Sequence, residues 1–182
     1  MLHKRNDLEI VEVLRKREAH IREVAKSLDM TPSTAMRIMD RLRDERVVDF
    51  RSQGKNKVYQ LKKTPESYTY LHMVENYKLL KILQIPWLRR IVLKLKEFSR
   101  GELIVLFGSF ATGNTREGSD IDIYVETDDS ALKNNLRKIS EKLSIKTGKL
   151  DKDSPLTREI IRNHVVIQNV QRLYEIHEEI SR

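Results

Sequence analysis

The sequence has no cysteine, one tryptophan, six glycines and four prolines among its 182 residues. The lack of cysteine excludes disulfides, thiol chemistry and cysteine-based zinc sites. No uninterrupted apolar run approaches the roughly 20 residues of a membrane-spanning helix. The first ten residues, MLHKRNDLEI, are charged and lack the apolar core of a signal peptide. We therefore expect a cytoplasmic protein with no membrane partner.

Charged residues are abundant and unevenly distributed along the chain. They make up 34% of the sequence, and the formal net charge is +8. Residues 1–63 carry 16 Lys/Arg against 10 Asp/Glu, residues 64–100 carry 7 against 3, and residues 101–182 carry 12 against 14. The basic excess lies wholly in the first two segments, which predicts a polyanionic partner there.

The first 63 residues show a helical pattern three times and then a strand pattern twice. Apolar residues at helical spacing predict helices over residues 7–18, 20–28 and 32–46, and strands are expected over 47–50 and 58–61. Thr31 and Pro32 suit the N-cap and first turn of the third helix. Three helices and a hairpin with a basic, Gly-centred loop make a winged helix-turn-helix. The segment resembles the DNA-binding domain of MarR- or ArsR-type regulators.

In those families the third helix enters the major groove of double-stranded DNA. Hydroxyl and guanidinium groups on its outward side reach base edges and phosphates, and basic residues on the wing lie against phosphates or the minor groove. The expected DNA-binding residues are Ser33, Thr34, Arg37 and Arg41 on the helix, and Arg51, Lys55 and Lys57 on the wing. The alternative is a protein-interaction module whose charges are only solvated.

Residues 64–100 are expected to form a helical linker of two helices that meet near Pro86. Tyr68, Tyr70 and Tyr77 belong to an apolar stripe on the first helix. Such a stripe could stack on nucleic acid, but we favour a core or dimer contact. A homodimer would suit paired DNA half-sites.

The most informative stretch is residues 103–125, LIVLFGSFATGNTREGSDIDIYV. An apolar strand runs into Gly108 and Ser109, a small pair that lets the backbone turn and leaves N–H groups free. Asp120 and Asp122 then lie two apart in an alternating strand, so they share one face. Adjacent carboxylates repel each other unless a cation lies between them. Mg²⁺ suits such a site because, in proteins, carboxylates and substrate phosphates commonly bind it together. A solvent-facing acidic strand would explain neither the Gly-Ser pair nor the spacing.

This stretch resembles the DNA polymerase β-like nucleotidyltransferase superfamily, most closely its minimal nucleotidyltransferase branch. The resemblance implies that Gly108, Ser109 and the nearby Ser119 bind a nucleoside triphosphate, with ATP the first choice. It also implies that Asp120 and Asp122 are catalytic and bind Mg²⁺. The reaction would transfer a nucleotidyl group to a hydroxyl of a protein, an RNA or a small molecule.

The family also uses a third carboxylate on a neighbouring strand, here expected near residues 144–150, SIKTGKL. Lys146 falls near the expected position, and Asp151 and Asp153 follow a few residues later. Either these aspartates substitute through a shifted register, or the third carboxylate is absent. Two functions stay open: a DNA-binding nucleotidyltransferase, and a non-catalytic transcription regulator whose C-terminal domain senses nucleotide or dimerises.

We therefore expect an α+β chain with two domains. A winged helix-turn-helix covers residues 1–63, a helical linker covers 64–100, and an α/β nucleotidyltransferase fold with a mixed sheet covers 101–182. After the motif, the pattern predicts a helix over 131–143, a strand over 143–150, and further helices towards the C-terminus.

Overall fold

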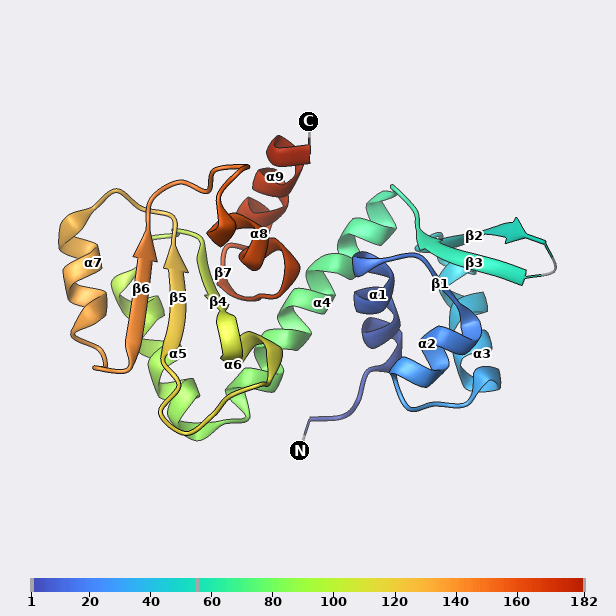
Figure 1. Cartoon of the computed structure of the whole chain (residues 1–182), viewed down its shortest axis with the longest axis horizontal. Helices are drawn as coiled ribbons and strands as arrows, with labels where there is room; N and C mark the ends of the chain where they lie inside the picture. Colours follow the sequence, from blue (N-terminus) through green and yellow to red (C-terminus); the bar gives the residue numbers. More distant parts are fainter. Residues whose placement is uncertain (1, 55, 182) are drawn as a thin grey trace. The chain divides into compact units, whose positions relative to one another are not determined.

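The computed structural model of the chain describes residues 2–54 and 56–181. It contains two compact units, Met1–Tyr77 and Lys78–Arg182, and Figure 1 shows the elements of each. The expected fold class is confirmed, since a small helical unit with a three-stranded sheet precedes an α/β unit with a mixed sheet. The domain limits expected from the sequence, after residues 63 and 100, stay a prediction.

The first unit has the element order of a winged helix. Its elements are α1 (Asn6–Lys16), β1 (Ala19–His20), α2 (Ile21–Ser27), α3 (Pro32–Asp44), β2 (Val48–Gln53), β3 (Asn56–Leu61) and the first part of α4 (Pro65–Leu83). The strands form an antiparallel sheet in the order β1-β3-β2. The hairpin of β2 and β3 is longer than the strand pattern indicated.

The core of this unit is built from the inner faces of the amphipathic helices. The four α3 residues spaced at i, i+3, i+4 and i+7 are all buried, namely Ala35, Ile38, Met39 and Leu42. Thr31 caps α3 as expected, with its hydroxyl oxygen accepting from the Thr34 N–H at 3.2 Å. Burying large aliphatic side chains contributes about 1.5–3 kcal/mol each, so these positions fix how α3 lies on the core.

The short strand β1 was not anticipated, because the helical pattern appeared to start at residue 20. His20 instead pairs with Val58 of β3 and caps α2. Its backbone N–H donates to Glu23 Oε2 at 2.8 Å, and its Nδ1 lies 2.9 Å from the Lys57 carbonyl oxygen. His20 thereby links the start of α2 to the base of the wing.

The second unit is an α/β structure around a mixed four-stranded sheet. Its elements are the end of α4, α5 (Pro86–Phe98), β4 (Ile104–Phe107), α6 (Gly108–Thr112), β5 (Ile121–Val125), α7 (Ser130–Arg137), β6 (Leu143–Thr147), α8 (Pro155–Arg162), β7 (Val165–Gln168) and α9 (Val170–Ser181). The strand order is β6-β5-β4-β7. β5 and β6 run parallel, while β4 is antiparallel to both β5 and β7.

Helices cover both faces of this sheet, and alternation along the strands separates the two cores. Ile121 and Ile123 of β5 join the core beneath α5 and α7. Tyr124 joins the core formed with α8 and α9. Asp122 is two residues before Tyr124 on the same strand, so it lies on that second face. β5 therefore directs its isoleucines and its aspartate to opposite sides of the sheet.

Two elements after the motif end earlier than the sequence pattern suggested. α7 stops at Arg137 because Ser140 turns the chain: its hydroxyl accepts from the Lys142 N–H at 3.3 Å, and its carbonyl accepts from the Leu143 N–H at 3.1 Å. β6 stops at Thr147, and the next residue, Gly148, accepts a 2.6 Å hydrogen bond from the Tyr124 hydroxyl. Burial raises the pKa of that phenol.

Within residues 2–54 and 56–181, no helix is both long and apolar enough to cross a bilayer.

Candidate functional site

The antiparallel pairing of β4 and β5 brings the two halves of the motif together. Phe107, the last residue of β4, lies opposite Asp122 in the register. The chain then turns at Gly108 into the five-residue helix α6, which contacts both strands. The Gly-Ser pair and Asp122 therefore lie side by side at one end of the sheet, as the sequence motif predicted.

Gly108 fits against the carboxylate of Asp122 so closely that no side chain has room. A Cβ on Gly108 would lie 2.5 Å from Asp122 Oδ2 and 3.3 Å from its Cγ. The φ angle of Gly108 is +68°, in the left-handed region that favours glycine. Both observations give the glycine a physical role, since it lets the backbone pass beside a carboxylate oxygen.

The remaining motif residues lie in or beside the loop before β5. Asp120 is exposed and Asp122 is half-buried. Ser119 closes a turn, with its N–H donating to the Arg116 carbonyl at 3.1 Å and its hydroxyl accepting from the Arg116 N–H at 2.9 Å. The hydroxyl of Ser119 thus shapes the loop that leads into Asp120, while the Arg116 side chain is left exposed.

The position beside Asp122 on the neighbouring strand holds a serine. Ser144 pairs with Asp122 in the parallel register of β5 and β6, whereas Lys146 pairs with Tyr124. Asp151 lies beyond β6 in a turn, where its carboxylate accepts from the Asp153 N–H at 3.2 Å. Over residues 2–54 and 56–181, no three His, Cys, Asp or Glu side chains gather as a metal-binding group. A third carboxylate does not join the pair in this part of the chain.

The two aspartates still suit a magnesium ion that is bound by carboxylates and by substrate phosphates together. Mg²⁺ binds oxygen, keeps several waters, and commonly takes only one or two carboxylates together with substrate phosphates. Asp122 offers a carboxylate oxygen next to a glycine backbone, and Asp120 is open to solvent. These residues fit a magnesium–nucleotide complex better than a cage built wholly from protein ligands.

In the winged helix, the residues of α3 that were expected to bind DNA lie at its start and on its outer side. Ser33 and Arg37 are exposed and Thr34 is half-buried. The hydroxyls of Ser33 and Thr34 lie 3.0 and 2.9 Å from the Thr31 hydroxyl, in the capping network. Arg37 makes no ion pair with the described residues, so its guanidinium is available to an anion.

Two of the expected DNA-binding arginines are held in ion pairs within the unit. Arg41 Nη2 lies 3.5 Å from Asp7 Oδ2, and Arg41 Nε lies 3.8 Å from Glu45 Oε1. Arg51 Nη2 lies 2.7 Å from Glu18 Oε2. Both side chains are more than half exposed, and part of their positive charge is already compensated.

Asp7 connects α3 to the N-terminal segment through two arginines. Arg5 donates to both carboxylate oxygens, Nε to Oδ1 at 3.0 Å and Nη2 to Oδ2 at 2.8 Å. Burial raises the pKa of Asp7, but the hydrogen bonds from Arg5 and the charges of Arg5 and Arg41 outweigh it. The pKa of Asp7 therefore lies below its ordinary value.

On the wing, Lys57 is exposed and its Nζ lies 4.1 Å from the centroid of the Phe50 ring, a cation–π contact. Lys55 lies outside the described residues. Two further basic residues, Arg22 and Lys26, were not among those expected to bind DNA; they are four apart on α2, exposed, and without an ion partner among the described residues. Their i, i+4 spacing was the signal that could have marked them as one basic face.

Comparison with known proteins identifies the second region. Residues 88–177 match the family model described as "Nucleotidyltransferase domain". No curated protein matches the sequence.

Solved structures similar to part of the chain include three bacterial proteins. They are the transcriptional repressor BigR from Xylella fastidiosa (19% identity, 37% of this chain and 67% of that chain, TM-score 0.35), ZitR from Lactococcus lactis (14%, 43% and 62%, TM-score 0.36) and the adhesin competence repressor AdcR from Streptococcus pyogenes (12%, 44% and 66%, TM-score 0.36). The matches cover less than two thirds of ZitR and AdcR. These TM-scores are too low to indicate a shared fold, so the winged helix is assigned from its own element order and sheet.

The resemblance inferred from the Gly-Ser pair and the Asp-Ile-Asp motif is confirmed. Residues 88–177 are a nucleotidyltransferase domain, and this domain follows an N-terminal winged helix.

Proposed function

We propose that this protein binds double-stranded DNA through its winged helix and binds a magnesium–nucleoside triphosphate complex, with ATP the first candidate, through Gly108, Ser109, Asp120 and Asp122. In its catalytic form the domain transfers a nucleotidyl group to a hydroxyl acceptor on a protein or an RNA. The observation that carries this proposal is the packing of Gly108 against Asp122, which leaves no space for a Cβ.

The proposed roles of the residues combine that packing with the roles that the nucleotidyltransferase resemblance implies. The Gly108 backbone and the Ser109 hydroxyl would donate hydrogen bonds to the phosphates of the nucleotide. Asp120 and Asp122 would hold the magnesium ion, and Ser119 would shape the loop that presents Asp120. Bound Mg²⁺ supplies charge neutralisation to the phosphates and orients them for in-line attack.

A second candidate function is a regulator that binds the nucleotide without turnover. Ser144 favours it, because the position in register with Asp122 carries no carboxylate. In nucleotidyl transfer a carboxylate there would accept the proton of the attacking hydroxyl, and losing a general base commonly costs roughly 10²–10⁴ in rate. Nucleotide binding needs only the metal and phosphate contacts, so it tolerates a serine.

DNA binding is supported by the charge distribution and by α3. The first 63 residues hold 16 basic and 10 acidic side chains, and Arg37, Arg22 and Lys26 are exposed without ion partners among the described residues. A homodimer would present two such helices to paired half-sites.

Incubation of the full chain with α-labelled ATP and Mg²⁺ tests the nucleotidyltransferase proposal. Label on an added protein or RNA acceptor that disappears in Asp122→Ala supports the enzyme. Saturable, Mg²⁺-dependent ATP binding without any label transfer supports the regulator. If the wild-type chain and Asp122→Ala bind ATP equally, or neither binds it, both forms of the proposal are wrong.

A further inference from the structure

Helices α5 and α7 contact each other on one face of the four-stranded sheet, and together they form a strongly basic layer. Residues 86–100 hold five Lys/Arg and one Asp/Glu, and residues 130–142 hold four and one. The other residues from 101 to 182 hold eight and thirteen. A basic layer in an otherwise acidic domain points to a polyanion that binds there.

The cations of this layer are open to solvent and lack neutralising neighbours. Eight of the nine basic side chains are exposed, and only Lys133 is half-buried. Within the part of the chain that the structure describes, none of the eight makes an ion pair. By contrast, Arg172 of α9, on the other face of the sheet, lies 2.8 Å from Glu126 and 3.0 Å from Glu179. The layer therefore keeps a charge that an anion from outside the chain can neutralise.

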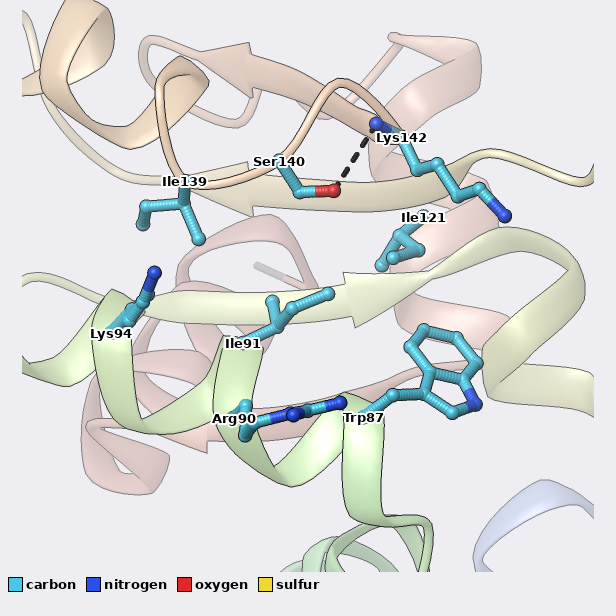
Figure 2. A pocket seen from close by; sticks show the side chains of 8 residues that line it. All are labelled: Trp87, Arg90, Ile91, Lys94, Ile121, Ile139, Ser140 and Lys142. Atoms are coloured by element: carbon cyan, nitrogen blue, oxygen red, sulfur yellow. Dashed lines mark hydrogen bonds between the residues drawn. The ribbon is translucent and has the colours of Figure 1, made fainter.

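A groove lies in this layer, between α5 and the turn that joins α7 to β6. It has a volume of about 380 Å³, within the range of ligand sites. Ile91, Ile121 and Ile139 line it, and Figure 2 shows Ile91 and Ile121 towards the middle of the view. Trp87, the only tryptophan of the chain, lies towards one end and is 39% exposed. The groove thus offers an apolar surface with an accessible aromatic ring.

The cations of the groove lie apart from one another rather than around one point. Figure 2 shows Lys94 towards one end, Lys142 towards the other and Arg90 along the α5 side. Separated cations suit a chain of phosphates better than one small anion, because each phosphate then needs only one Lys or Arg. Among the residues that the structure describes, no Asp or Glu lines the groove.

We propose that this groove binds a short stretch of single-stranded nucleic acid, RNA or DNA, as a site distinct from the winged helix and the aspartate pair. The bases lie against Trp87 and the isoleucines, and successive phosphates lie near Arg90, Lys94 and Lys142. Proteins bind single strands by combining aromatic stacking with basic residues that follow the backbone. A duplex keeps its bases paired inside, so it does not stack on Trp87 in this way.

The groove is separate from the aspartate pair. Ile121, which lines the groove, belongs to the core beneath α5 and α7. Asp122, the next residue of β5, lies on the opposite face and pairs with Phe107 of the other core. The inference therefore does not depend on nucleotide binding by Asp122, and the two can fail independently.

Trp87 reports on the groove directly, because it is the only tryptophan of the chain. The full chain is titrated in EDTA with oligo(U), oligo(dT) and duplex DNA, each about ten nucleotides long, a length within the range of single-strand sites. We expect both single strands to quench the tryptophan fluorescence saturably, and the duplex to bind there at least tenfold more weakly. No saturable change with either single strand, or an equal response to the duplex, would overturn the proposal.

The two single strands distinguish the possible sources of the ligand. Tighter binding of oligo(U) identifies RNA, because only RNA carries the 2′-hydroxyl. Equal binding of oligo(U) and oligo(dT) supports a site that uses only the phosphates and base faces common to both. Anionic phospholipid vesicles that shift the Trp87 emission while the oligonucleotides leave it unchanged would assign the basic layer to a membrane surface and overturn the proposal.

Matched variants test the contribution of the groove cations. Arg90→Ala, Lys94→Ala and Lys142→Ala should each weaken single-strand binding about three- to tenfold. Each should also reduce the slope of log affinity against log salt by about 0.7, the value for one phosphate contact of a single strand. Arg162→Ala is the matched control, because it removes an exposed cation of α8, which packs on the other face of the sheet. An equal loss in Arg162→Ala would show that binding follows net charge alone, and would contradict the assignment.

Variants of Trp87 test stacking through the fluorescence anisotropy of a labelled oligonucleotide. Trp87→Ala should weaken binding about tenfold, whereas Trp87→Phe should keep most of it. Because Trp87 also meets the Phe110 ring edge-on, at 5.4 Å between centroids, circular dichroism checks that both variants are folded. A folded Trp87→Ala that binds as tightly as the wild type would overturn the proposal.

Two further variants locate the strand on the chain. Arg37→Ala alters the helix proposed to bind duplex DNA, and Asp122→Asn alters the proposed magnesium site. Both should leave the Trp87 titration with single strands unchanged. A loss of binding in either variant would place the strand at the winged helix or at the aspartate pair, and would overturn the assignment to the groove.

Discussion

Gly108 and Asp122 lie in contact across the β4–β5 pair, with Oδ2 of the aspartate occupying the space that a Cβ at position 108 would need. The two residues are separated by a loop, yet each constrains the other. Glycine is required for its φ angle and for its lack of a side chain.

Gly108→Ala should abolish Mg²⁺-dependent ATP binding, because its Cβ would lie 2.5 Å from Asp122 Oδ2 and must displace that carboxylate. Gly113→Ala is the matched control: Gly113 has a φ angle of +76°, but a Cβ there meets nothing within 4 Å. Both variants carry a similar backbone strain of about 1–2 kcal/mol. Calorimetric titration with ATP and Mg²⁺ measures the difference, and equal binding by the two variants would contradict the role assigned to Gly108.

Ser144→Asp should tighten the binding of Mg²⁺, because it adds a carboxylate on the strand position in register with Asp122. Lys146→Asp changes a residue of the same strand and parity but in register with Tyr124, so it should have a much smaller effect. Binding of Mn²⁺ followed by electron paramagnetic resonance gives a readout that does not depend on activity. The expectation fails if both aspartate variants bind the metal alike.

Arg37→Ala should weaken binding to duplex DNA and lower the slope of log affinity against log salt by about 1, as expected for the loss of one phosphate contact. Lys16→Ala is the control, since it also removes one positive charge but from α1, where Lys16 lies 3.3 Å from Glu12. Fluorescence anisotropy over a salt series measures both. A scaffold with no DNA role would show no salt-sensitive binding by any variant, wild type included.

Asp7→Asn should lower the free energy of unfolding by about 1–3 kcal/mol at neutral pH, the cost of leaving buried hydrogen-bonding groups unsatisfied. The pKa of Asp7 is lower in the folded chain than its ordinary 3.8. Its stabilisation is therefore fully present above that value and is lost as the pH falls through the folded pKa. Urea unfolding of both proteins should give a constant difference from pH 7 to pH 5 and a shrinking one below pH 4. A difference that grows on acidification would contradict this assignment.

The same variant reports on α3, because Asp7 also lies beside Arg41. Freed from Asp7, Arg41 keeps only its weaker contact with Glu45. We expect Asp7→Asn to bind duplex DNA at least as tightly as the wild type at a temperature where both are folded. Circular dichroism of the same samples controls for folding.

The sequence predicted those features of the fold that depend only on residues close together along the chain. The Thr31–Pro32 cap, the buried stripe of α3 and the Gly-Ser turn are each set by neighbours within one or two turns of chain, and each appears in the structure. The strand alternation also placed Asp122 on β5, where it contacts the glycine, whereas Asp120, expected on the same strand, lies in the loop just before β5. These features depend on backbone preference and on side-chain period, which a single sequence records.

What could not be read from the sequence depends on pairing between distant segments. Ser144 is the partner of Asp122 on β6, and the turn from the end of α7 at Arg137 into that strand could not be placed, because helix ends are the least predictable feature of a periodic pattern. The ion pairs of Arg41 and Arg51 need Asp7 and Glu18, which the fold brings in from α1 and from the residue just before β1.

Helix α4 contributes side chains to the core of the first unit and to the core beneath α5 and α7 in the second. Val74 and Tyr77 are buried in the first, where the Tyr77 hydroxyl accepts from the Arg5 N–H at 3.1 Å, while Ile82 packs against the second. Any attempt to express either half alone must therefore cut within a helix, and a fragment that stops before Val74 would lose Val74 and Tyr77 from the first core. Fragments that overlap along α4, each keeping the turns its own core requires, are the rational choice for testing the proposed DNA binding and nucleotide binding separately.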